Sequence, residues 1–135
     1  MINDAGLVIL ILKIAVGAVT VLWISSLVAL AYGRIRLHGR INLVFFFLTV
    51  SALVGLEVIA RIINPELFSQ FLRDRDAVGT LTLHLCFSMP AAALLFIMLF
   101  TGLKHYRVAH ISTGIVFGML WAGTFITGIF FLPHE

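Results

Sequence analysis

The sequence predicts an all-α, polytopic membrane protein in which four transmembrane helices form an up-down bundle. Of its 135 residues, 61% are hydrophobic and only 11% are charged, whereas soluble domains average about 45–50% apolar and about 25% charged residues. The mean hydropathy of +1.14 excludes a disordered chain, and the single cysteine excludes a disulfide scaffold. The composition therefore indicates a chain that is surrounded largely by hydrocarbon.

Four apolar segments are long enough to cross a bilayer, which takes about 20 helical residues. The predicted spans cover residues 6–32, 41–63, 80–103 and 111–132. Too few residues lie outside these spans to form a soluble domain, so we expect a single transmembrane domain over residues 1–135. Any site must then lie between helices or at their ends, where polar side chains face protein or water.

The basic residues of the short connections predict the orientation. Arg34, Arg36 and Arg40 precede the second span, and Lys104 and Arg107 precede the fourth. Because Lys and Arg in short loops favour the inner side of a membrane, we expect both of these connections inside and both the N- and the C-terminus on the outer side.

Packing between the spans is predicted from two features. Pro90 lies in the middle of the third span and removes one backbone hydrogen bond, which predicts a kink unless neighbours compensate. The fourth span carries a face of small, aromatic and polar residues that we expect to pack against protein. This face consists of Thr113, Phe117, Trp121, Thr124 and Gly128.

Histidines are the main chemical signal, because ionisable groups within a membrane are costly and usually have a partner. His38, His105 and His110 lie in or beside the inner connections, whereas His84 lies about a turn into the third span from the outer side. His134 follows the last span. His84 and Lys104 are 20 residues apart, which is about 30 Å of helix at about 1.5 Å per residue, so one metal ion cannot bind both sets.

The inner candidate site combines His38 and His110, with His105 close in sequence to the latter. Neutral imidazoles at comparable depth could ligate a metal or bind haem iron axially, with the neighbouring arginines and lysine meeting the haem propionates. The alternative is a basic surface that contacts anionic lipid headgroups. Residue chemistry alone leaves both interpretations open.

The outer candidate site combines His84 with Glu57, because a carboxylate commonly orients an imidazole in metal, proton or quinone sites. Ser88 lies four residues after His84 and shares its helix face. Arg61 lies four residues after Glu57 and offers an ion pair within one helix instead. His134 reaches this region only if the C-terminus folds back.

Catalytic motifs are absent from the sequence. A copper site built from His84, Cys86 and Met89 conflicts with helical geometry, because about 100° per residue directs these side chains to different faces. There is also no CxxC pair, HExxH helix or Walker loop. The sequence therefore gives no support for hydrolytic catalysis. The net charge of +3 comes from the inner connections, so we expect no binding of nucleic acid.

Three stretches together resemble the YozB/CtaM-like family of small polytopic membrane proteins. They are LHGRIN, TLTLHLCFSMPAA and KHYRVAHISTGIVFGMLWAGTFITGIFFLPH, within residues 38–134, and they include the run Trp121, Thr124, Thr127 and Gly128. The resemblance implies a multi-pass protein of a prokaryotic plasma membrane that assists maturation of haem-copper cytochrome oxidases. It also implies that His38, His84 and His110 are ligands of haem or, alternatively, of copper.

These observations leave three functional hypotheses. The first is an assembly or accessory factor of a respiratory oxidase, with other membrane protein subunits and the lipid bilayer as its partners. The second is a small b-type haem or quinol-reactive electron carrier, because the histidines lie at two depths. The third is a purely structural subunit of a larger membrane complex, in which the histidines lie at interfaces.

Overall fold

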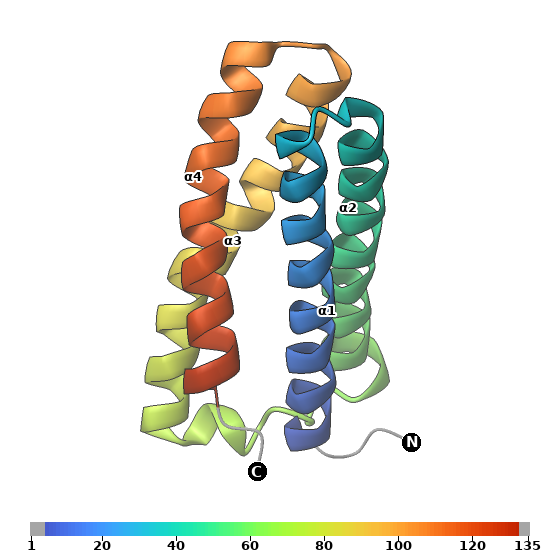
Figure 1. Cartoon of the computed structure of the whole chain (residues 1–135). Helices are drawn as coiled ribbons and strands as arrows, with labels where there is room; N and C mark the ends of the chain where they lie inside the picture. The colour runs from blue at the N-terminus through green and yellow to red at the C-terminus, as the bar shows by residue number, and fades with distance from the viewer. Residues whose placement is uncertain (1–4, 133–135) are drawn as a thin grey trace. The chain divides into compact units, whose positions relative to one another are not determined.

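The computed structural model describes residues 5–132, and these contain four helices that are long and apolar enough to cross a membrane (Figure 1). The helices are α1 (Ala5–Ala31), α2 (Ile35–Val58), α3 (Arg75–Leu103) and α4 (Arg107–Ile126). Short π-helical segments, η1 (Ile59–Ile63) and η3 (Thr127–Phe131), continue α2 and α4, and η2 (Phe71–Arg73) is a 3₁₀ turn. The residues described include no strand. The all-α class and the four spans are confirmed, and the outward orientation of the termini stays a prediction.

Three helices begin before the spans that hydropathy predicts. α2 begins at residue 35 instead of 41, α3 at 75 instead of 80, and α4 at 107 instead of 111. Hydropathy marks only the stretch that fits hydrocarbon, whereas arginine and lysine are good helix formers and extend a helix past that stretch. His38 and His110 therefore lie inside helices and not in the connections.

The chain divides into two compact units, and the first comprises described residues 5–73. In this unit α1 and α2 form an antiparallel hairpin (Figure 1). Gly33 turns the chain with φ of 74°, a backbone conformation that costs glycine no steric strain. Val19 and Ala29 of α1 and Phe45 and Phe46 of α2 are buried and form much of the core of this unit.

The second unit comprises described residues 74–132, in which α3 and α4 form another antiparallel hairpin. Asp74 caps α3 by accepting a hydrogen bond from the Asp76 amide at 3.0 Å. α3 continues through Pro90 as one helix, and its ribbon changes direction along its length in Figure 1. The rings of Phe117 and Trp121 stack with centroids 5.7 Å apart. These two residues are buried together with Thr124 and Gly128, which confirms the predicted packing face of α4.

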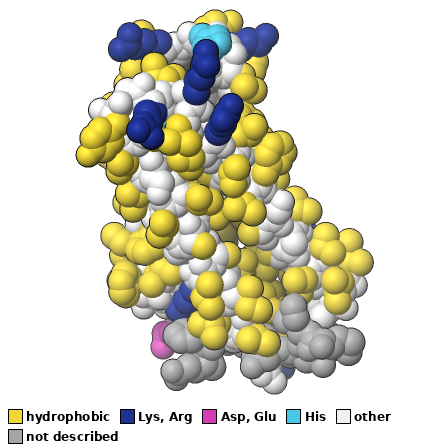
Figure 2. All heavy atoms as spheres, turned by 45° about the vertical axis from the view of Figure 1, so that its right-hand side comes forward, with side chains coloured by type: hydrophobic (Ala, Val, Ile, Leu, Met, Phe, Trp, Pro, Cys, Tyr) yellow, Lys and Arg dark blue, Asp and Glu magenta, His cyan; other side chains and the backbone are white. Residues whose placement is uncertain are grey.

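Most apolar side chains of the four helices point outward. In each of the four spans, at most 28% of the residues in the most apolar 18-residue stretch are buried. Figure 2 shows hydrophobic side chains over most of the face in view. Apolar surface of this extent is unfavourable in water and favourable in hydrocarbon, so the structure supports a multi-pass membrane protein.

Gly123 lies directly against the ring of Phe87, and a methyl group at this position would overlap the ring. We expect Gly123→Ala to destabilise the α3–α4 hairpin by about 1–3 kcal/mol, the usual cost of overpacking. The matched variant Gly114→Ala places its new carbon 3.8 Å from Met98 Cε, an ordinary contact, and should not destabilise the protein. Unfolding in detergent, followed by circular dichroism, compares the two variants. Equal stabilities would contradict this close packing.

Candidate functional site

His38 lies near the start of α2 within a closed network of polar side chains. Its Nδ1 donates to the main-chain oxygen of Ser26 on α1 at 3.0 Å, because a carbonyl oxygen can only accept. Its Nε2 accepts a hydrogen bond from Asn42 Nδ2 at 3.1 Å. The Ser26 hydroxyl is fully buried and donates to Asn42 Oδ1 at 2.6 Å. Both ring nitrogens of His38 are therefore engaged by protein, and the network joins α1 to α2.

His110 lies in the first turn of α4 and contacts the end of α3. Its Nδ1 donates to the Met98 carbonyl oxygen at 3.0 Å and lies 3.3 Å from Thr101 Oγ1. The ring packs on Gly102, where an added Cβ would lie 3.1 Å from the His110 Cε1 atom. The proton is thus held on Nδ1, which leaves the lone pair of the neutral ring on Nε2.

His84 makes the corresponding contact at the other end of the hairpin. Its Nδ1 lies 2.9 Å from Thr127 Oγ1 in η3. The single proton of that hydroxyl is directed to the Gly123 carbonyl at 2.7 Å, so His84 Nδ1 is the donor. The ring packs on Gly128, where an added Cβ would lie 3.1 Å from the His84 Cε1 atom. His84 is therefore held in the same tautomer as His110.

The two contacts of the α3–α4 hairpin are reciprocal and follow a repeated sequence pattern. In each helix a histidine is followed 17 residues later by Thr-Gly, as His84 is by Thr101 and His110 by Thr127. Each histidine packs on the Thr-Gly pair of the opposite helix. The 17 residues between the two contacts correspond to about 25 Å of helix at about 1.5 Å per residue, so a single ligand cannot touch both histidines.

Sequence patterns did not predict Ser26, Asn42 or Thr101 as partners of the histidines. They identified Thr127 only as a member of the run that ends at Gly128. The signal that could have found the threonines is the repeated spacing of histidine and Thr-Gly. Asn42 could have been found because it lies one turn after His38 on the same helix face.

The other predicted site residues lie apart from these histidine contacts. Glu57 forms an exposed ion pair with Arg61 on its own helix turn, as the four-residue spacing predicted. Ser88 is half-buried and forms no hydrogen bond with His84, whereas His105 is exposed in the turn between α3 and α4. His134 lies outside the described residues.

A metal centre with several protein ligands is not present in the part of the chain that the structure describes. Residues 5–132 contain no group of three or more His, Cys, Asp or Glu side chains that could hold a metal ion. What the arrangement offers is single imidazoles whose Nδ1 is held by a protein acceptor. This second-sphere hydrogen bond is typical of histidines that bind a metal through Nε2.

Comparison with known proteins identifies no relative. No family model, curated protein or solved structure matches this chain.

The hydrogen-bond network of Ser26 predicts that replacing this serine destabilises the protein, whereas replacing the adjacent Ser25 does not. Ser26→Ala removes the buried hydroxyl that bonds Asn42, and leaving that amide oxygen without its donor should cost about 1–3 kcal/mol. Ser25→Ala is the matched control, because Ser25 is exposed and bonds only the Val21 carbonyl of its own helix. Unfolding in detergent measures both, and an unaffected Ser26→Ala protein would contradict the network.

The hydrogen bond between His84 Nδ1 and the Thr127 hydroxyl leads to a prediction about the His84 ring. Thr127→Val keeps the side-chain shape but removes the hydroxyl that accepts from His84 Nδ1. We expect the ¹⁵N shift of His84 Nδ1 to change and the hairpin to lose about 0.6–1.7 kcal/mol. Thr113→Val is the matched control, because the Thr113 hydroxyl bonds only carbonyl oxygens of α4. The ¹⁵N chemical shifts of the histidine rings report the tautomers. A His84 ring unchanged in Thr127→Val would refute this role of Thr127.

Proposed function

We propose that the chain is an integral membrane accessory or assembly factor of a respiratory haem-copper oxidase, located in the plasma membrane of a prokaryote. The observation that carries the proposal is the way His84 is held, with its proton on Nδ1 and its lone pair on Nε2. The resemblance of the sequence to the YozB/CtaM-like family supports the link to an oxidase.

Haem fits the available donors better than copper does. A haem can be held through a single axial imidazole nitrogen, and His84 supplies such an atom. His110 lies too far from His84 to be the second ligand of the same haem. Copper sites in proteins generally gather several nitrogen or sulfur ligands, and residues 5–132 contain no such group of three. When bound, haem would supply redox-active iron, and the acceptor of the His84 Nδ1 proton would orient the imidazole. His38 could supply such an atom only if Asn42 released its Nε2.

A purely structural subunit is the second candidate, and a specific observation favours it. Each of the three histidines already forms a hydrogen bond that ties one helix of a hairpin to the other. Such bonds would hold a small membrane subunit together without any ligand. In that case the histidines contribute to stability, and the spectrum of the protein stays featureless.

Two measurements test the proposal, one on a deletion strain and one on the purified protein. Deleting the gene should lower oxidase activity while the transcripts of the oxidase subunits stay unchanged. The protein purified gently in detergent should show a Soret band, with α and β bands after reduction by dithionite. We expect His84→Ala to lower the haem content at least about tenfold, since even loss of a supporting residue commonly lowers affinity 10–100-fold.

His105→Ala is the matched control, because this histidine is exposed in a turn and makes no helix–helix contact of the kind described. Its haem content should equal that of the unmodified protein. Normal oxidase activity in the deletion strain would contradict the accessory role. A featureless spectrum together with destabilised His84→Ala and His110→Ala proteins would favour the structural subunit.

A further inference from the structure

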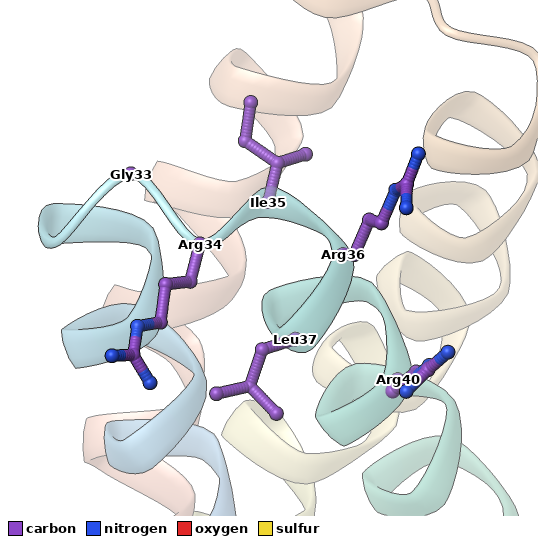
Figure 3. A pocket seen from close by; sticks show the side chains of 6 residues that line it. All are labelled: Gly33, Arg34, Ile35, Arg36, Leu37 and Arg40. Atoms are coloured by element: carbon purple, nitrogen blue, oxygen red, sulfur yellow. The ribbon is translucent and has the colours of Figure 1, made fainter.

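The turn between α1 and α2 carries three arginines around an open hollow of about 500 Å³. Figure 3 shows Arg34 beside α1, whereas Arg36 and Arg40 lie one turn apart and extend to the same side of α2. The lining of the hollow consists of Gly33, Arg34, Ile35, Arg36, Leu37 and Arg40. The hollow thus combines three cationic side chains with apolar ones.

These arginines have no acidic or hydrogen-bonding partner among the residues described. None of the three side chains forms a hydrogen bond or ion pair with residues 5–132. No Asp or Glu occurs from residue 5 to residue 56. Each guanidinium carries five N–H donors in a planar fork that matches phosphate oxygens, so the turn presents a concentrated set of donors to an external anion.

The start of α2 adds to this positive field. Arg34 occupies the N-cap position without a side-chain cap, and the first turn contains no acidic residue. The first backbone amides of the helix therefore point toward the same region without an acidic side chain to neutralise them.

Exposed apolar side chains lie next to the arginines and indicate an amphiphilic ligand. Ile35, which is 71% exposed, and Leu37 line the hollow, and Tyr32, which is 80% exposed, directly precedes Gly33 in the turn. The turn joins two spans, so it lies where a bilayer meets water, the region in which tyrosine is enriched. A small water-soluble anion would gain nothing from these apolar groups, whereas a phospholipid would cover them with its acyl chains.

We propose that the α1–α2 turn binds the headgroup phosphate of an anionic phospholipid. Arg36 and Arg40 hold the phosphate, Arg34 adds charge from the other side of the turn, and the acyl chains lie along the exposed apolar surfaces of α1 and α2. This lipid site does not depend on the proposed oxidase function or on haem.

Binding of single lipids to the full-length protein tests the site. Delipidated protein in a neutral detergent is titrated with phosphatidylglycerol, phosphatidylcholine or inorganic phosphate, and bound molecules are counted by native mass spectrometry. We expect phosphatidylglycerol to bind at least about tenfold more tightly than phosphatidylcholine, since each arginine near a surface contributes appreciably to anionic lipid binding. We expect Arg36→Gln/Arg40→Gln to lose this preference.

The matched control is Arg73→Gln/Arg75→Gln, which removes the same charge beside the acidic residues Asp74 and Asp76. It should keep the preference within about twofold. Arg36→Lys/Arg40→Lys keeps the charge but loses the planar fork of the guanidinium. It should still prefer phosphatidylglycerol to phosphatidylcholine but bind it more weakly than the unmodified protein does, which tests the site even if the glutamine pair folds poorly.

Three results would overturn the proposal. The first is equal binding of the two lipids to the unmodified protein. The second is an unchanged preference in the Arg36→Gln/Arg40→Gln protein. The third is inorganic phosphate binding as tightly as phosphatidylglycerol, which would assign the arginines to a free anion instead of a lipid.

Discussion

A polar group inside a bilayer has no water to bond, and this constraint decides both the backbone and the polar contacts of the chain. The backbone satisfies it by forming helices through all four apolar segments. The hydroxyls of Thr101 and Thr127 satisfy it by donating to carbonyl oxygens one turn earlier, those of Ile97 and Gly123. The oxygen atoms of these hydroxyls can then accept only from another helix, and a histidine ring meets each of them there.

The same contacts connect stability with chemistry. A histidine that donates its Nδ1 proton across a hairpin holds two helices together, and in the neutral ring it must carry its lone pair on Nε2. The glycines beside the threonines are part of this arrangement, because a Cβ at either position would lie 3.1 Å from the histidine ring, tighter than an ordinary contact. His38 differs because Asn42 engages its Nε2. The three predicted ligands are therefore chemically unequal, although they look alike in the sequence.

Charge is distributed unevenly within the first unit. Glu57 and Arg61 neutralise each other on one helix turn toward the end of α2. The three arginines at the α1–α2 turn have no such partner among the described residues, and the hollow between them is open. Opposite ends of one hairpin thus face their surroundings differently, and a membrane with an anionic leaflet would bias the orientation of this hairpin.

The sequence by itself determined the all-α class, the four spans, the Glu57–Arg61 pair and the packing face of α4. Each of these depends on hydropathy or on spacing within one helix, which are local properties of the chain. Only the tertiary structure decided which residues hold His38, His84 and His110, and therefore which ring nitrogen carries the proton. The repeat of histidine and Thr-Gly is visible in the sequence, but its members meet only when two antiparallel helices pack in a particular register. That register depends on side-chain fit between segments distant in the chain, so no pattern within one helix determines it.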